Sequence, residues 1–134
     1  MRRHLALADV LALHAYMMRA TGWQPAPLRG GGEELLESAV MRPRMAEHYA
    51  GADLIRQAAL LAVGISQAQA FVDGNKRTAY IAALTFLRAN GHRVRLDDGG
   101  LALARELERV AERTDSMEAA TDRFEAWLRA QPTE

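Results

Sequence analysis

The sequence predicts an all-α fold: a single domain of about six helices over residues 1–134. Two observations carry this prediction. Strong helix formers (Ala, Leu, Arg and Glu) dominate the chain, whereas β-branched residues are scarce. Glycine and proline gather in a few short stretches between apolar segments of helical periodicity. The length of 134 residues is that of one ordinary domain, and we see no repeat or linker within it.

The first expected helix lies near the N-terminus. Asp9 is placed to cap it, apolar residues follow at helical spacing, and Gly22 lies just past its end. Residues 21–32 then contain two prolines and four glycines. This composition predicts a loop, and the three glycines before the next helix, residues 30–32, are expected to form a flexible connector.

A short helix is expected next over residues 33–41, because Pro43 should stop it from continuing far. Residues 42–52 are then expected to form an irregular surface segment. Asp53 is placed to cap a longer helix that reaches about Gln69. Because this helix is apolar around much of its circumference, we expect it to be central in the fold.

Three further helices are expected in the second half of the chain. Residues 76–91 predict a helix that is apolar on most sides, and residues 92–96 alternate as a brief extended piece does. Residues 99–114 and 115–130 are amphipathic, and the second of these segments opens with Asp115 in a capping position.

The composition excludes several classes of protein. Lys and Arg number 17, as do Asp and Glu, and this balance argues against a general nucleic-acid or membrane-surface binder. No apolar run approaches the roughly 20 residues that span a bilayer, and we recognise no secretory leader. The absence of cysteine excludes disulfides and thiolate metal sites. We expect a cytoplasmic protein without direct contact to nucleic acid or membrane.

Residues 69–80, QAFVDGNKRTAY, combine charged and turn-forming residues at an expected helix start. Gly74 permits a positive φ or a close backbone approach. From Asn75 onward the first helical N–H groups lack partners, and such a helix end attracts anions. Lys76 and Arg77 add two cations. On residue types alone, a phosphate site and an ordinary solvated turn are equally good interpretations.

Two other residues of this stretch bear on the choice. Asp73 would repel a phosphate unless it holds Mg²⁺, which characteristically uses one or two carboxylates together with phosphate oxygens. Phe71 is expected to anchor the loop in the core. The combination points to a nucleotide bound with a metal ion.

The stretch closely resembles the signature of the Fic/Doc family, His-x-Phe-x-Asp-Gly/Ala-Asn-Lys-Arg-Thr-Ala. Eight fixed positions match: Phe71, Asp73, Gly74, Asn75, Lys76, Arg77, Thr78 and Ala79. Lys76 and Tyr80 suit the Doc branch, the death-on-curing toxins, better than the Fic branch. The resemblance covers about the first 100 residues well.

The resemblance implies a toxin of a toxin–antitoxin system, with a cognate antitoxin as its partner. Doc-like toxins bind ATP with Mg²⁺, transfer the γ-phosphate to a threonine of elongation factor Tu and so halt translation. By this analogy Asp73 would hold the metal ion. Gly74, Asn75, Lys76 and Arg77 would bind the phosphates. Asp73, Lys76 and Arg77 would take part in catalysis, which for phosphoryl transfer is mostly positioning and charge stabilisation.

The family also uses a flap near the motif to dock its protein target. The segment after residue 41 is expected to contain this flap. Its candidate docking residues are Arg42, Arg44, His48 and Tyr49. A solvated loop is the alternative interpretation.

Gln69 is the departure from the family pattern. The family has histidine there as the general base on the attacking hydroxyl, and a glutamine amide takes up no proton near neutral pH. Proton transfer of this kind typically contributes about 10²–10⁴-fold in rate. We therefore expect the chain to keep its nucleotide site and to lose most of its turnover.

Three origins of Gln69 stay open: an introduced substitution, a natural degenerate member, or a base supplied by another residue, for which His48 is the one histidine considered. Two other functions also stay open. One is transfer of AMP, as in the Fic branch. The other is a non-catalytic module that binds a nucleotide or a partner with the same fold.

Overall fold

The computed structural model describes residues 2–96, 101–111 and 116–134. Six helices form the fold, which confirms the predicted all-α class: α1 (Leu7–Ala20), α2 (Gly32–Ala50), α3 (Leu54–Ala68), α4 (Asn75–Ala89), α5 (Leu101–Ala111) and α6 (Met117–Arg129). Two isolated antiparallel bridges join Leu28 to Phe71 and Val94 to Thr133. Among the described residues, no helix is both long and apolar enough to cross a membrane.

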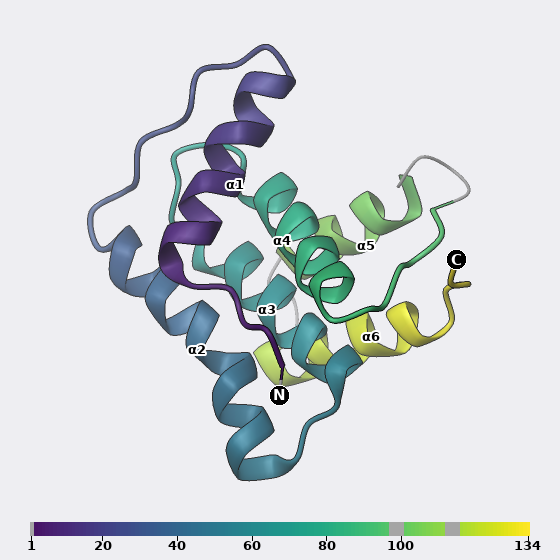
Figure 1. The fold of residues 1–134 in the computed structure, drawn as a ribbon. Helices are drawn as coiled ribbons and strands as arrows, with labels where there is room; N and C mark the ends of the chain where they lie inside the picture. Colours follow the sequence, from purple (N-terminus) through teal and green to yellow (C-terminus); the bar gives the residue numbers. More distant parts are fainter. Residues whose placement is uncertain (1, 97–100, 112–115) are drawn as a thin grey trace.

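The helix α3 lies at the centre of the bundle, as its apolar circumference predicts (Figure 1). It packs against α2, α4, α5 and α6, and its residues 61–67 are all buried. Its contact with α2 is close at Gly64, where an added Cβ would lie 3.2 Å from the Cβ of Ala39 and 3.4 Å from the Cδ of Arg42. A small residue at this position therefore lets the two helices approach each other.

The helix α2 is longer than expected, and the prediction that Pro43 stops it is wrong. Pro43 lies inside the helix and is buried, and the helix continues to Ala50 before Gly51 ends it with φ 63°. A proline costs the helix one backbone hydrogen bond. Burial of this face of α2 against α3 offsets that cost, so residues 42–50 are helical and not an irregular segment.

The helix α1 begins two residues earlier than its predicted cap. Asp9 is not the N-cap but lies within the first turn, and Ala6 is the N-cap. The Asp9 carboxylate still accepts a hydrogen bond from the Ala6 N–H at 2.8 Å. The acid therefore satisfies a free donor at this helix end from inside the helix.

The capping residues of two later helices also follow from side-chain hydrogen bonds. Asp53 caps α3 as predicted, because its Oδ1 accepts from the N–H of Arg56 at 2.9 Å. In α6 the N-cap is Ser116, whose Oγ accepts from the N–H of Ala119 at 3.1 Å. Asp115, the cap expected from the sequence, lies outside the described residues.

The alternating residues after α4 form the brief extended piece that their pattern predicts. Arg95 N–H donates to the carbonyl of Pro132 at 2.8 Å, and Glu134 N–H donates to that of Arg93 at 3.0 Å. These bonds attach the C-terminal segment to the chain on the α5 and α6 side of the bundle. The loop between α3 and α4 lies on the other side, next to α1 (Figure 1).

Candidate functional site

The motif lies where α3 ends and α4 begins, and two left-handed residues shape the turn between them. Gln69 follows α3 with φ 50° and ψ 40°, and it is the one non-glycine residue with positive φ in the described part of the chain. Gly74 precedes α4 with φ 86°, as the sequence predicted. A Cβ at Gly74 would lie 2.9 Å from the sulfur of Met18 and 3.2 Å from Nε2 of His14. Both conformation and space therefore require glycine at residue 74.

Asn75 clamps the loop through its side chain. Its Oδ1 accepts from the N–H of Phe71 and its Nδ2 donates to the carbonyl of the same residue, both at 2.9 Å. Asn75 is buried, so these bonds leave its amide little freedom to turn toward a ligand. Its contribution to an anion site in this geometry is its backbone N–H at the start of α4.

Phe71 anchors the loop, and its partner is a residue that the sequence analysis passed over. The Phe71 ring is buried and stacks on the ring of His14, with centroids 3.6 Å apart and an interplanar angle of 6°. His14 Nε2 donates to the carbonyl of Asp73 at 3.0 Å. Because a carbonyl only accepts and burial lowers the pKa of His14, we assign the neutral tautomer with its proton on Nε2.

The signal that could have found His14 is its spacing in α1. It lies four residues after Val10 and four before Met18, and all three residues are buried. This i, i+4 pattern places the imidazole on the inward face of the helix. A histidine on an apolar face needs a buried partner, and the carbonyl of Asp73 supplies it.

The connector between α1 and α2 is pinned to the motif loop. Arg29 N–H donates to the carbonyl of Ala70 at 2.7 Å, and Val72 N–H donates to that of Pro27 at 3.0 Å. Arg29 Nε adds a bond to the carbonyl of Phe71 at 3.2 Å. Within the predicted loop, residues 27–29 therefore form a fixed segment that lies beside the motif.

The packing behind this segment is equally close. A Cβ at Gly32, the first residue of α2, would lie 2.5 Å from the carbonyl oxygen of Ala70. That distance is too short for any side chain. The last glycine of the connector thus lets the N-terminus of α2 reach the motif loop.

The charged residues of the motif are held loosely. The side chains of Asp73, Lys76 and Arg77 are 61%, 47% and 43% exposed. An Arg77 guanidinium nitrogen lies 3.8 Å from Oδ2 of Asp73, and Lys76 Nζ lies 3.5 Å from Oε1 of Glu108. Such long contacts at the surface contribute little.

These cations also diverge from each other. A second guanidinium nitrogen of Arg77 lies 3.4 Å from the hydroxyl of Thr21 at the end of α1, whereas Lys76 turns toward α5. Only weak contacts would break if both side chains turned inward. The positive end of α4, to which the structure gives no side-chain cap hydrogen bond, lies between them.

The residues present fit a metal ion only when phosphate oxygens of a bound nucleotide supply most of its ligands. Within the described part of the chain, no group of three or more acidic, histidine or cysteine side chains could hold one. Asp73 offers a single exposed carboxylate, of which Oδ1 accepts from the N–H of Gly74 at 2.8 Å. One carboxylate plus phosphate oxygens is a characteristic Mg²⁺ arrangement, so Asp73 fits that role as a lone protein ligand.

Gln69 directs its side chain back onto α3. Its Nε2 donates to the carbonyl of Ser66 at 2.9 Å, and the residue is half-buried. An amide at this place can orient a hydroxyl but accepts no proton near neutral pH. Histidine is among the residues that tolerate positive φ best, so the backbone at residue 69 would also accept the family's histidine.

The predicted docking residues lie on α2 and away from the motif. Arg44 donates to the carbonyl of Leu5 at 3.3 Å, and the ring of His48 packs edge-on against that of Tyr49. At 1.5 Å per residue, His48 lies about 24 Å along α2 from the end that reaches the motif loop. In this geometry His48 therefore cannot act as the general base in place of residue 69.

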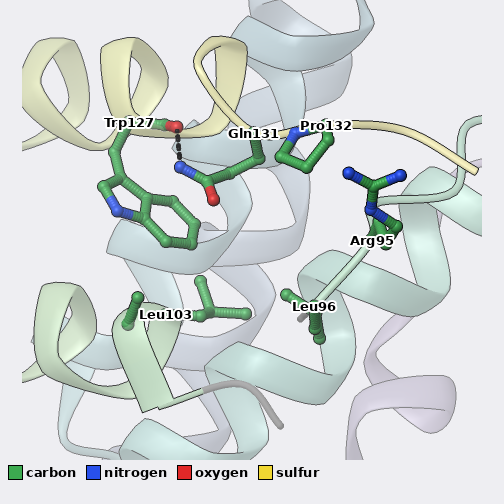
Figure 2. Close-up of a pocket in the computed structure, with 7 residues that line it drawn as sticks. Arg95, Leu96, Leu103, Trp127, Gln131 and Pro132 are labelled. Atoms are coloured by element: carbon green, nitrogen blue, oxygen red, sulfur yellow. Dashed lines mark hydrogen bonds between the residues drawn. The ribbon is translucent and has the colours of Figure 1, made fainter. Parts of the chain in front are cut away.

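Two cavities lie apart from the motif, and none of residues 69–80 lines either of them. Figure 2 shows the smaller, of about 200 Å³, between α5 and the C-terminal segment, where Gln131 donates to the carbonyl of Trp127 at 2.9 Å. The larger, of about 430 Å³, adjoins it along α4 and residues 92–96.

Comparison with known proteins agrees with the resemblance carried by the motif. The Fic/DOC family profile matches residues 4–87. The chain is also 43% identical over 65 residues to the protein named Toxin Doc from Mycolicibacterium smegmatis (strain ATCC 700084 / mc(2)155). That alignment covers 47% of this chain and 50% of the relative, so the chain spans about half the length of the relative it matches. Since the profile covers more than half of the residues, this chain belongs to the Fic/DOC family.

Proposed function

We propose that the chain is a Doc-like toxin of a toxin–antitoxin system, built to move the γ-phosphate of ATP to a hydroxyl of a translation protein. Elongation factor Tu is the target by analogy, and a cognate antitoxin is the partner. The observation that carries the proposal is the run from Phe71 to Ala79, placed at the open N-terminus of α4. The similarity to the protein named Toxin Doc supports it.

In this proposal the N-terminus of α4 binds the phosphates through backbone N–H groups from Asn75 onward. Lys76 and Arg77 turn inward from their weak contacts and neutralise the transferred group. Asp73 would hold Mg²⁺, which when bound supplies neutralisation of charge on the phosphate oxygens. The clamp of Asn75 on Phe71 keeps these groups in register during the reaction.

The transfer also needs a place for one proton. The hydroxyl oxygen of the target bonds to the γ-phosphorus, the bond from that phosphorus to the bridging oxygen breaks, and ADP leaves. The hydroxyl proton must go to a base, and Gln69 occupies the position where the family has one. We therefore propose that the chain, as it stands, binds nucleotide and turns over slowly or not at all.

Target docking in this proposal involves two surfaces. Residues 27–29 lie beside the motif and would contact the target close to the accepted hydroxyl. The docking residues expected from the sequence, Arg42, Arg44, His48 and Tyr49, lie along α2 and would contact a more distant part of the target.

The test is to place histidine at residue 69. We expect Gln69→His to transfer label from γ-labelled ATP to purified elongation factor Tu, while the unchanged chain transfers about 10²–10⁴-fold less. Gln69→Asn is the matched control, because asparagine also tolerates positive φ but offers no base. Label that arrives only from α-labelled ATP would replace the proposal with transfer of AMP. No label from either would refute transfer to this target.

A second candidate function follows from the amide of Gln69 and its bond to Ser66. A chain that binds Mg²⁺·ATP and gives no transfer even as Gln69→His is a non-catalytic binding module. Growth of cells that express Gln69→His separates the two candidates. If the chain is a toxin, these cells should stop growing, and co-expression of an antitoxin should restore growth. If it is a binding module, they should grow normally.

A further inference from the structure

The outer face of α2 carries large apolar side chains that the described residues leave exposed. Four of them lie along the helix: Leu35 at 47%, Met41 at 39%, Met45 at 51% and Tyr49 at 77% exposure. The helix lies at the edge of the molecule, with its opposite face on α3 (Figure 1). Methionine adapts easily to a contacting surface, and two of the four residues are methionine.

Two opposite charges flank Ser38 symmetrically on this face. Glu34 lies four residues before Ser38 and Arg42 four residues after it, so the three side chains form one row along the helix. All three residues are exposed, and the stem of Arg42 also lies against α3 at Gly64. None of the described residues forms an ion pair with Glu34 or Arg42, so the guanidinium is able to turn toward a second copy. The row therefore reads acid, small residue, base, and it is complementary to itself when two copies run antiparallel.

We infer that a second copy of this chain packs on α2, with a two-fold axis that passes at Ser38. Rows of residues four apart are inclined by about 26° to a helix axis, so two antiparallel rows in contact make the helices cross at about 50°, the commonest packing class. Glu34 of each copy then faces Arg42 of the other. Ser38 is small enough for the two helices to approach at the crossing point.

The apolar residues complete this arrangement. Leu35 and Met41 lie on the two sides of the row, close to the crossing point, where each meets its own counterpart in the second copy. Such a contact, made by one helix face, is small by the standard of specific interfaces, which bury about 1,200 Å² or more. We therefore expect a weak dimer that salt destabilises, because charge pairs at the rim of an interface are screened.

The inference does not rest on the proposed function. It involves neither nucleotide nor the motif, which α2 meets at Gly32, before the row begins. It shares Arg42 with the proposed docking of a target. Rescue by exchange of charges distinguishes the two, because only a second copy presents Glu34 to Arg42.

Sedimentation equilibrium of the full chain over a range of concentrations provides the first test. We expect Glu34→Arg and Arg42→Glu each to raise the dimer dissociation constant at least about tenfold, because like charges then face each other. The double variant should return to within about threefold of the unchanged chain. Glu33→Arg is the matched control: it reverses a charge in the same helical turn but off the row, and should leave dimerisation unchanged. A chain that stays monomeric up to its solubility limit, or a double variant that fails to recover, overturns the inference.

Cross-linking gives an independent test, because the chain has no cysteine of its own. Ser38→Cys places two thiols at the proposed axis and should form a disulfide-linked dimer on mild oxidation, at least about tenfold faster than a surface thiol elsewhere. Ala126→Cys, at an exposed position of α6, is the control. Equal rates for the two variants would contradict a contact at Ser38.

Discussion

The two ends of the central helix α3 are fastened by different chemistry. At its N-terminus, Arg129 bonds both carboxylate oxygens of Asp53 at 2.8 and 2.9 Å, and Arg56 bonds Glu125 at 3.1 Å. At its C-terminus, the motif loop is held without ion pairs: by the Asn75 clamp, the aromatic stack, backbone pairing with residues 27–29 and the bond from Arg29 to the carbonyl of Phe71. Ion pairs fasten one end, whereas bonds to backbone groups and an aromatic stack fasten the other.

The charged residues at the two ends of α3 therefore have different roles: those at the N-terminal end stabilise the fold, and those at the motif are available to a ligand. At the N-terminal end the charged side chains are paired at short distance and are committed to holding α6 on α3. At the motif, Asp73, Lys76 and Arg77 make only long contacts with other charged side chains, so their charges stay available to a ligand. Substitution of a charge should therefore cost stability at the first end and binding at the second.

The largest effect on stability should come from the aromatic anchor of the motif. Phe71→Ala removes a buried ring that stacks on His14, and truncation of this kind costs about 3–5 kcal/mol. The free energy of unfolding from urea titration measures the loss. Phe71→Leu keeps most of the volume and should cost clearly less. Equal losses for the two variants would mean that the stack on His14, and not the volume of the side chain, accounts for the anchoring.

The next effect concerns the clamp. Asn75→Ala leaves both backbone groups of Phe71 without a partner in a buried place, so we expect a loss of about 2–4 kcal/mol in the free energy of unfolding. Asn75→Asp is the control, because a carboxylate keeps the acceptor and loses only the donor. The free energy of unfolding of Asn75→Asp should lie between that of the unchanged chain and that of Asn75→Ala. A loss below that of an ordinary surface substitution would show that the clamp is not what holds the loop.

Removal of the hydrogen bond from His14 should cost less than removal of the clamp. His14→Phe preserves a ring against Phe71 and takes away the donor to the carbonyl of Asp73, a change worth about 1–3 kcal/mol. Hydrogen exchange at the amides of residues 71–75 should rise in this variant more than exchange in α6. Uniform exchange throughout the chain would indicate that His14 fills space and does not position the loop.

At the charged end, Asp53→Ala should cost about 1 kcal/mol, the usual value of an N-cap. The hydrogen bond from the Arg56 N–H, followed by that from Arg129, lowers the pKa of the Asp53 carboxyl below its ordinary value of 3.8. The unfolded chain therefore takes up this proton at higher pH than the folded chain does. The stabilisation is complete above about pH 4 and is lost as the pH falls through the folded pKa.

Acid titration of the free energy of unfolding tests this pH dependence. The unchanged chain and Asp53→Asn should converge as the pH falls below 4, because the carboxyl is then neutral in the folded chain too. Glu37→Gln, at an exposed position of α2 away from this charged cluster, controls for general charge effects. A constant difference between the unchanged chain and Asp53→Asn over this range would contradict the assignment.

The smallest effect on stability should come from the motif charges. Asp73→Ala and Arg77→Ala should each change the free energy of unfolding by less than about 0.5 kcal/mol. Their effect belongs to ATP binding, measured by calorimetric titration with and without Mg²⁺. Arg77→Ala should weaken binding in both conditions by about 1.5–3 kcal/mol. Asp73→Ala should weaken it in Mg²⁺ and not in EDTA.

Two results would revise that picture. If Asp73→Ala weakens ATP binding equally in EDTA, Asp73 is a cap on the loop, a role that its bond to the Gly74 N–H would explain. If Arg77→Ala binds ATP normally, the phosphates do not lie between Lys76 and Arg77.

Much of the fold could be predicted from local sequence, because local signals decide where these helices begin and end. Asp53 before an apolar run and Gly74 within the motif, just before α4, are such signals, and both act as expected. Pro43 misleads because its cost is local, whereas what offsets it is burial against α3, a segment distant in the chain. Tertiary packing overrides propensity where a whole helix face is buried.

The site shows the same division. The motif's position, the left-handed Gly74 and the buried Phe71 follow from residue types in order. Asn75 is expected to bind phosphate, and the structure directs its side chain to the backbone of Phe71. An amide fits either use equally well, so spacing could not decide. His14 and residues 27–29 reach the loop from distant parts of the chain. Local sequence can show that a residue faces inward, but it cannot predict which distant segment that residue contacts.

The sequence distance of these contacts has a consequence for how the chain folds. The partners that hold the motif loop from afar, His14 and residues 27–29, lie 59 and about 42 residues from it. Closing such long loops costs entropy before any contact repays it, so the motif should be ordered late, after α1, α2 and α3 have docked. All of these distant partners precede the loop in the chain. During synthesis from the N-terminus, these partners are made before residues 69–75 emerge. The loop can therefore pack against them as soon as it is synthesised.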